Sequence, residues 1–191
     1  MSPLPFPISV IGASAGAVQA LLKILPVLPV DYPGAVVVAV HVPPDRSNVL
    51  VPLLQSRCRI RVKEAEDKEP IASGVVYFAP SDYHLLAEKD GTLSLSSDEL
   101  VNYSRPSIDV LFQTAADAFG EALTAVILTG ANDDGAAGLS AVGAAGGRVL
   151  VEEPQGAYAS AMPAAALSAC PDAQRLSVTQ IAHHLAALRP E

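Results

Sequence analysis

Three residues of this chain have side chains that together can carry out nucleophilic catalysis. They are Ser14, His41 and Asp134, and each follows a short run of apolar residues. A serine hydroxyl attacks a carbonyl carbon well only when a base takes its proton, and an imidazole is the better base when a carboxylate fixes its tautomer. The three residue types therefore indicate a serine hydrolase, provided that the fold brings them together.

The surroundings of Ser14 are typical of a strand, a sharp turn and a helix. Ile8, Val10 and Ile11 favour a buried strand, and Gly12-Ala13-Ser14-Ala15-Gly16 has the form G-x-S-x-G of a nucleophile elbow. The N–H groups of Ala15 and Gly16, at the start of the helix, are then placed to stabilise an oxyanion. The alternative is a glycine-rich turn that only lets a helix pack closely on a sheet.

His41 and Asp134 are expected just beyond the carboxyl ends of two further strands. Residues 35–40 form a continuous apolar run, and His41 follows it, held by the stiff loop Val42-Pro43-Pro44. A second such run, residues 125–128, leads into a loop of turn-forming residues that ends in Asp134 and Gly135. Parallel strands would gather all three side chains at one edge of a sheet.

The remaining patterns predict strands alternating with helices. Further strands are expected over residues 57–63, 75–79 and 148–151, the last as the final strand, with a hairpin over residues 85–95 that turns at Asp90-Gly91. Helices are expected over residues 18–25, 48–56, 108–119, 136–145, from Pro163 onward, and 178–188. In residues 57–63 cations alternate with apolar residues, which favours a solvated edge strand over a docking surface.

This order predicts an α/β fold: a doubly wound, mostly parallel sheet with helices on both faces and one antiparallel β-hairpin. In such folds ligands bind outside the carboxyl ends of the strands. With 191 residues, half of them hydrophobic, residues 1–191 are expected to form a single domain.

Composition restricts the partners and the compartment. The net charge of −8 argues against nucleic-acid binding, because phosphates require a basic face. Neither a signal peptide nor a membrane-spanning stretch is expected. Cys58 and Cys170 lack metal-ligand spacing, so we expect two unpaired thiols in a reducing compartment. The chain is therefore expected to be soluble and cytoplasmic, without membrane insertion.

Two other enzyme classes fit the sequence less well. A dinucleotide-binding dehydrogenase would need an acidic residue where His41 stands, and none of the five tyrosines has a lysine four residues later. A lipase-type hydrolase has its histidine last in the chain. The candidates for that order are His183 and His184, which lie beside an apolar stripe and are expected at the surface, and His84 is expected to be structural. No metal site and no cofactor is expected.

Several segments, in order along the chain, resemble the catalytic domain of the chemotaxis protein-glutamate methylesterases of the CheB type. The segments are Ile11-Gly12-Ala13-Ser14-Ala15-Gly16, Val40-His41-Val42-Pro43, Val76-Tyr77-Phe78-Ala79-Pro80 through His84-Leu85, Arg105-Pro106-Ser107-Ile108-Asp109-Val110-Leu111-Phe112, Ile127-Leu128-Thr129-Gly130 through Asp134-Gly135-Ala136-Ala137-Gly138, and Ala161-Met162-Pro163. The resemblance covers nearly the full length of the chain.

The resemblance implies a function and a role for each residue. Ser14 would be the nucleophile, His41 the general base and acid, and Asp134 the orienting carboxylate, with the adjacent Asp133 a turn former. Ala15 N–H would help to hold the oxyanion, and Gly16 and Ala131 would line the substrate site. The substrate would be a glutamate γ-methyl ester on the cytoplasmic signalling helices of a chemoreceptor, with methanol released, and some members also deamidate glutamine there.

The chain departs from the family pattern in several respects. It has Ala131-Asn132 where the family usually has Met-Gly, and Ala17 where the family often has a second glycine. The family's receiver domain is not expected within this chain, so a separate response-regulator chain is one expected partner, and the absence of such regulation is the alternative. Ala131 removes a large side chain beside the predicted site. The alternatives are therefore a catalytically weakened binding or scaffold homologue in a chemosensory pathway, and an esterase with a different substrate.

Overall fold

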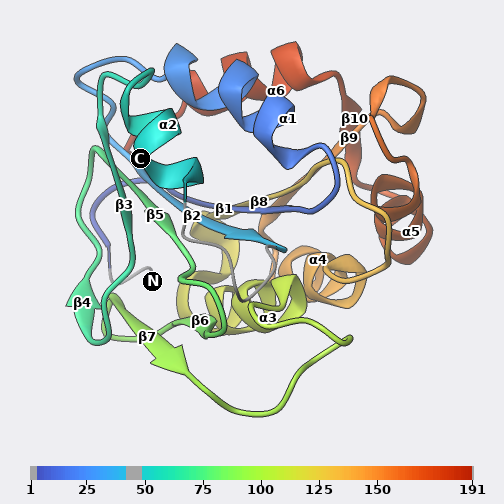
Figure 1. The fold of residues 1–191 in the computed structure, drawn as a ribbon, viewed down its shortest axis with the longest axis horizontal. Helices are drawn as coiled ribbons and strands as arrows, with labels where there is room; N and C mark the ends of the chain where they lie inside the picture. The colour runs from blue at the N-terminus through green and yellow to red at the C-terminus, as the bar shows by residue number, and fades with distance from the viewer. Residues whose placement is uncertain (1–3, 42–48, 191) are drawn as a thin grey trace.

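The computed structural model describes residues 4–41 and 49–190, which form a parallel sheet covered by helices on both faces (Figure 1). The seven strands of this sheet lie in the order β10-β9-β8-β1-β2-β5-β3, and neighbouring strands are parallel throughout. Their bounds are β1 (Ile8–Ala13), β2 (Ala35–Val40), β3 (Arg61–Glu64), β5 (Val75–Phe78), β8 (Leu123–Ile127), β9 (Arg148–Glu152) and β10 (Gln174–Leu176). The predicted fold class is confirmed.

Helices on the two faces of the sheet bury two separate hydrophobic cores. One face is covered by α1 (Ala17–Ile24), α2 (Leu50–Gln55) and α6 (Val178–Ala186), and the other by α3 (Ile108–Phe119), α4 (Ala136–Ala144) and α5 (Ala161–Ala169) (Figure 1). Short 3-10 turns follow α1 (Leu25–Val27) and α3 (Gly120–Ala122), and a third precedes α5 (Pro154–Gly156). Because both faces are covered, β1 and β2 are buried along their whole length, which explains why their sequences are apolar apart from Ser9 of β1.

A small antiparallel sheet packs on the α3 side. The predicted hairpin is present as β6 (His84–Ala87) and β7 (Thr92–Ser96), and a strand that was not predicted, β4 (Glu69–Pro70), pairs with β7. β6 packs against α3, and His84 at the start of β6 accepts the N–H of Ser107, the N-cap residue of α3. The hairpin therefore belongs to the support of the site.

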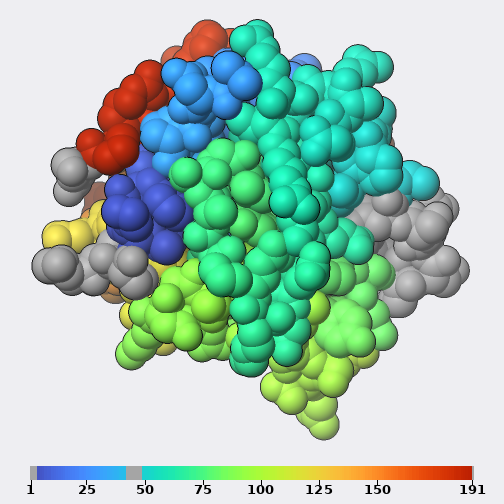
Figure 2. All heavy atoms as spheres, turned by 90° about the vertical axis from the view of Figure 1, so that its left-hand side faces the viewer, coloured from blue at the N-terminus to red at the C-terminus, as the bar shows by residue number. Residues whose placement is uncertain are grey.

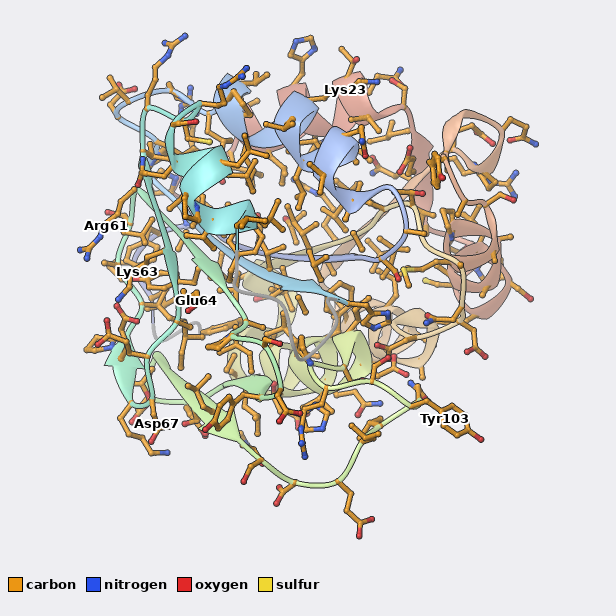
Figure 3. The ribbon with its side chains drawn as sticks, in the orientation of Figure 1. Lys23, Arg61, Lys63, Glu64, Asp67 and Tyr103 are labelled. Atoms are coloured by element: carbon orange, nitrogen blue, oxygen red, sulfur yellow. The ribbon has the colours of Figure 1, made fainter. Side chains whose placement is uncertain are left out.

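Two sequence predictions are corrected. Residues 57–63 do not form one strand, because Cys58 N–H still bonds to Leu54 at the end of α2, and β3 begins only at Arg61. β3 is nevertheless an edge strand on the side of the molecule that faces the viewer in Figure 2, and Figure 3 shows Arg61 and Lys63 at the left-hand margin. The strand at residue 148 is not the last, since β10 follows it. The predicted stiff loop Val42-Pro43-Pro44 and the helix start at Asn48 lie outside the described residues.

The chain reverses its direction of winding next to β1. It proceeds outward from β1 to β2 and beyond, and then returns to place β8 on the other side of β1. Such a reversal leaves a crevice at the carboxyl ends of the strands, where α/β proteins bind their ligands. Within residues 4–41 and 49–190, no helix has both the length and the apolar character that crossing a bilayer requires.

Candidate active site

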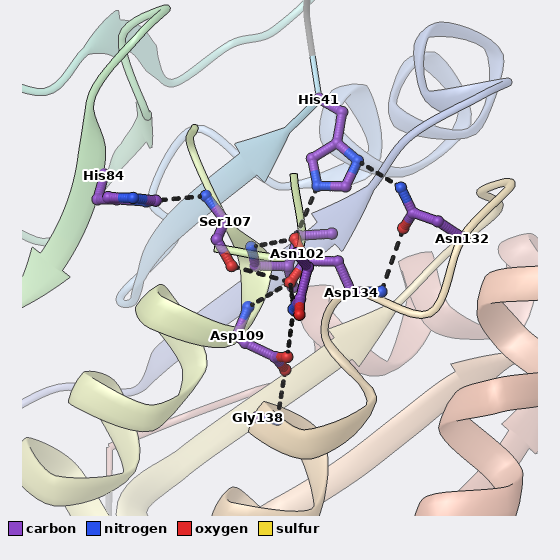
Figure 4. Close-up of polar contacts among 9 residues, drawn as sticks. His41, His84, Asn102, Ser107, Asp109, Asn132, Asp134 and Gly138 are labelled. Atoms are coloured by element: carbon purple, nitrogen blue, oxygen red, sulfur yellow. Dashed lines mark hydrogen bonds and ion pairs between the residues drawn. The ribbon is translucent and has the colours of Figure 1, made fainter. Parts of the chain in front are cut away.

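His41 and Asp134 form an ion pair at the carboxyl edge of the sheet. His41 directly follows β2, and its Nε2 lies 2.7 Å from Asp134 Oδ2 (Figure 4). The imidazole is 13% exposed, whereas the carboxylate is fully buried. A buried carboxylate at this distance fixes the tautomer with the proton on Nε2 and stabilises an imidazolium.

The carboxylate of Asp134 is held by the first turn of α3. The N–H groups of Ile108 and Asp109 donate to it at 2.7 and 3.2 Å, and the Ser107 hydroxyl donates at 2.8 Å. These N–H groups have no partner inside the helix, so an anion at this position satisfies them and also meets the positive end of the helix dipole. The N-terminus of α3 thus orients Asp134 toward His41.

The charge state of Asp134 follows from these contacts. Burial raises the pKa of this carboxyl, but hydrogen bonds from His41, Asn102 and Ile108 outweigh burial, and the net pKa is lowered. The neighbouring Asp109 has a raised pKa, chiefly because of burial and in part because of the charge on Asp134. The surroundings therefore favour the ionised form of Asp134 more than that of Asp109.

Ser14 and His41 directly follow two neighbouring strands. Ala13 of β1 and Val40 of β2 are the last paired residues, and adjacent strands lie about 5 Å apart, so continuation of the register predicts that Ser14 and His41 are neighbours. His41 N–H donates to Ala13 O at 3.2 Å, and Ser14 N–H donates to Thr129 O after β8 at 2.9 Å. The turn after β1 is thus tied to both neighbouring strands, and Ser14 is half-buried.

The turn after Ser14 has the form that the sequence predicts for an oxyanion site. Gly16 has φ 85° as the N-cap of α1, a left-handed conformation that glycine adopts without strain. Ala17 N–H returns to Ser14 O at 2.9 Å. Among the residues that the structure describes, none accepts a hydrogen bond from the N–H groups of Ala15 and Gly16.

Asn132 contacts the free nitrogen of the imidazole. Its Nδ2 lies 3.3 Å from His41 Nδ1, and its Oδ1 accepts the N–H of Asp134 at 3.1 Å. The second bond fixes the orientation of the amide, so the NH2 group faces the ring. Asn132, noted in the sequence as a departure from the family pattern, therefore contacts the proposed base, while Ala131 is exposed on the same loop.

A pocket of about 170 Å³ opens next to His41. Besides His41, it is lined by Asp82 and by residues from the segment between β7 and α3, which are Leu100, Tyr103, Ser104, Arg105 and Pro106. Arg105 anchors this segment, because its guanidinium bonds to Asp82 and to the carbonyl oxygens of Ser97 and Asp98. Tyr103 extends away from the body of the molecule at the rim (Figure 3).

The other candidates of the sequence analysis lie away from the reacting groups. His183 is exposed on α6, and His184 of the same helix lies 3.3 Å from Arg148. His84 is buried, and its Nδ1 accepts the N–H of Ser107, so it supports the N-cap of α3. Asp133 is exposed, and its carbonyl closes the turn into α4.

The two cysteines are free, and burial raises the pKa of the Cys58 thiol to about 11, which keeps that thiol protonated and unreactive. Among the described residues, no group of three or more His, Cys, Asp or Glu side chains could hold a metal ion.

Sequence reasoning missed two parts of the site, Asn102 and the Ser107–His84 contact. Asn102 Nδ2 donates to Asp134 Oδ1 at 2.8 Å (Figure 4). Neither part follows a strand or belongs to a periodic pattern. The available signals were that Asn102 lies three residues before the family-like segment that begins at Arg105, and that Ser107 and His84 lie within two such segments.

Comparison with known proteins identifies the family of this arrangement. Residues 9–185 match the family model described as CheB methylesterase. A putative protein-glutamate methylesterase/protein-glutamine glutaminase of Leptospira interrogans is 46% identical over 173 residues, which cover 91% of this chain and 90% of that protein. A protein-glutamate methylesterase/protein-glutamine glutaminase of Chromobacterium violaceum is 37% identical over 182 residues, and the match spans 94% of this chain but 50% of that protein.

A solved structure agrees with these sequence matches. The chain superposes on the crystal structure of the Thermotoga maritima CheB methylesterase catalytic domain with a TM-score of 0.91 and 33% identity. The match covers 96% of this chain and 98% of that one. The similarity therefore extends over the whole arrangement of sheet and helices that carries the site.

Proposed function

The chain belongs to the CheB methylesterase family, and from this premise we propose that it is a serine hydrolase that demethylates glutamate γ-methyl esters on chemoreceptor signalling helices. The observation that carries the proposal is the His41–Asp134 ion pair, in which His41 follows the end of β2 as Ser14 follows the end of the neighbouring strand β1. The names of the relatives add a second activity, deamidation of glutamine, which uses the same acyl chemistry with ammonia as the leaving group.

The proposed reaction assigns one task to each group. His41 Nδ1 takes the proton of Ser14 Oγ as the oxygen bonds to the ester carbonyl carbon, while Asp134 stabilises the imidazolium through Nε2. The N–H groups of Ala15 and Gly16 stabilise the oxyanion. The imidazolium then protonates the departing methoxide to give methanol. His41 then deprotonates a water molecule, which attacks the acyl carbon. The bond to Ser14 Oγ breaks, the glutamate side chain is released, and the imidazolium returns a proton to Ser14.

The proposed compartment and partners of the protein follow from the proposed substrate. The ester lies on the cytoplasmic helices of a chemoreceptor, so we place the protein in the cytoplasm and the receptor helix over the pocket beside His41 and Tyr103. A separate response-regulator chain is a further proposed partner. Its addition to the esterase assay, with and without phosphorylation, tests that part of the proposal.

The first experiment uses a fluorophosphonate probe and a methylated receptor fragment. The wild-type chain is expected to be labelled and to release methanol, and Ser14→Ala is expected to do neither. His41→Ala and Asp134→Asn are each expected to lower the rate of methanol release by about two orders of magnitude or more. Ser168→Ala on α5 and His183→Ala on α6 change exposed residues outside the site and serve as controls.

The outcomes separate the proposed enzyme from its alternatives. Labelling without methanol release favours an esterase with another substrate. If the wild-type chain is not labelled, the hydrolase proposal fails and the scaffold alternative is favoured. That alternative rests on Asn132, whose amide faces the nitrogen that must accept the proton of Ser14. Rates near the wild-type value in His41→Ala or Asp134→Asn would overturn the assignment of that residue.

A further inference from the structure

Asn102 lies at the tip of a tight turn between β7 and α3. Val101 and Ser104 exchange two backbone hydrogen bonds, of 3.1 and 3.0 Å. The two residues between them, Asn102 and Tyr103, have φ 52° and 60°, the positive values of the I′ class of turn. Asparagine tolerates this left-handed backbone better than most side chains do. The turn therefore holds the Asn102 side chain in a defined position.

The amide of Asn102 bridges two carboxylates. Its Nδ2 donates to Asp134 Oδ1 and to Asp109 Oδ2, each at 2.8 Å (Figure 4). Both carboxylates are buried, and Asp109 also accepts the N–H of Gly138 in α4 at 2.6 Å. Two negative groups so close together repel in a medium of low dielectric constant. An NH2 group has one hydrogen for each of them and brings no charge of its own.

Asn102 belongs to a different segment of the chain from the other hydrogen-bond donors to Asp134. His41 donates to Oδ2, and the remaining donors, Ser107 to Asp109, form the first turn of α3. Asn102 comes from the turn whose neighbours Leu100, Tyr103 and Ser104 line the pocket beside His41. A substrate in this pocket therefore packs against the same turn that holds Asp134.

We propose that Asn102 is a positioning residue of the reaction, which keeps the Asp134 carboxylate oriented toward His41 and separated from the charge of Asp109. This inference rests on the proposed function, because it assumes that the pair His41–Asp134 activates Ser14. The lowered pKa of Asp134, to which the hydrogen bond from Asn102 contributes, agrees with it. Removal of the amide is expected to weaken the orientation of the imidazole without touching the substrate.

The test compares Asn102→Gly with Asn102→Asp in the full chain. Glycine keeps the left-handed backbone and removes the amide. Aspartate keeps the size of the side chain, repels both carboxylates when ionised, and regains one O–H donor when protonated. The titratable groups around it are Asp109 of α3, Asp134 after β8 and, beyond Asp134, His41 after β2. A carboxyl between two carboxylates has a raised pKa, so protonation occurs within the assay range.

The readouts are kcat and KM for a small activated ester, and the rate at which Ser14 is labelled by a fluorophosphonate, both as functions of pH. For Asn102→Gly we expect kcat to fall about tenfold with little change in KM, and the acid limb of kcat/KM to move to higher pH. As pH falls from about 9 to about 6, kcat/KM of Asn102→Asp is expected to increase several-fold relative to kcat/KM of Asn102→Gly, because the aspartate becomes protonated. A purely structural role would not produce this pH dependence.

Lys68→Gly is the matched control, since the exposed Lys68 has φ 62° and follows Asp67, which lies on the opposite side of the molecule from Tyr103 in Figure 3. It is expected to keep the wild-type kcat. Wild-type rates in both Asn102 variants, or parallel pH profiles for the two, would overturn the inference. Because the small ester and the probe report on Ser14 itself, failure of the receptor fragment as a substrate leaves this test intact. A wild-type chain that reacts with neither would refute the proposed function itself.

Discussion

At the scale of single residues, both ring nitrogens of His41 have a partner. Nε2 pairs with the buried Asp134, so the proton sits there and Nδ1 carries the lone pair. Asn132 Nδ2 lies 3.3 Å from this lone pair, which the proposed reaction requires for the proton of Ser14. Where the resemblance gives glycine, this chain thus has a side chain that competes for the base.

This competition gives a prediction for Asn132→Gly. Loss of one exposed hydrogen bond is worth about 0.5–1 kcal/mol, so fluorophosphonate labelling of Ser14 is expected to become about two- to fivefold faster. Asp133→Gly, an equally exposed position in the same loop, controls for the added backbone freedom and is expected to label at the wild-type rate. Slower labelling of Asn132→Gly would contradict this view and would show that the amide supports the imidazole instead.

At the scale of elements, the site depends on how closely α3 approaches β1. Ile108, the first residue of α3, donates its N–H to Asp134, and its side chain is completely buried. A Cβ atom at Gly12 of β1 would overlap Ile108 Cγ2, and one at Gly135 would lie 2.7 Å from the same methyl group. The two glycines therefore allow the helix N-terminus to reach the carboxylate.

Gly12→Ala is expected to disturb both the packing and the site. The β-branched Ile108 has little rotamer freedom in a helix, so the helix must shift, at a cost of about 1–3 kcal/mol in the free energy of unfolding. Esterase activity is expected to fall more than tenfold under conditions where the variant is still folded. Urea unfolding and the ester assay measure the two effects.

Gly156→Ala is the matched control for this substitution, because a Cβ there meets no atom within 4 Å. Its stability is expected to stay within about 0.5 kcal/mol of the wild type. A Gly12→Ala variant that is as stable and active as this control would show that α3 can move without cost.

The elements that sequence patterns predict are those with a strong physical signal. Continuous apolar runs locate β1, β2 and β8 because both faces of the sheet are covered. The strands missed, β4 and β10, have two and three residues and no buried ones, so they carry no alternation to read. Ser14, His41 and Asp134 could be proposed from the sequence because each comes after a strand, whereas Asn102 reaches Asp134 only through a turn whose position depends on the whole fold.

At the scale of the whole molecule, a buried carboxylate links the sheet to the turn after β1 that contains Ser14. Glu152 at the end of β9 is 3% exposed and accepts the N–H of Thr129 at 2.8 Å. Thr129 in turn donates its hydroxyl to Ala15 O at 2.8 Å and accepts the N–H of Ser14 on its carbonyl. The edge of the sheet beyond β8 therefore supports the turn that holds Ser14.

Glu152 also makes stability depend on pH. Burial raises the pKa of its carboxyl, although the hydrogen bond from Thr129 and the charge of Lys23 oppose the shift. A carboxyl with a raised pKa in the folded state contributes stability that is complete below its unfolded pKa of about 4.3 and is lost as pH rises through the folded value. The wild-type chain is thus expected to lose this contribution between acidic and neutral pH.

Glu152→Gln removes the ionisation but keeps an oxygen that accepts the N–H of Thr129. The free energy of unfolding of this variant, minus that of the wild type, is therefore expected to increase as pH rises from about 4.5 to about 7.5. The variant thus becomes more stable relative to the wild type, whatever the difference at the lower pH. Urea unfolding at several pH values measures the difference. Glu121→Gln, at an exposed position, controls for the change in net charge. A difference that stays constant or decreases with pH would mean that ionisation of Glu152 does not destabilise the folded chain. The N–H of Thr129 would then donate to an ionised carboxylate.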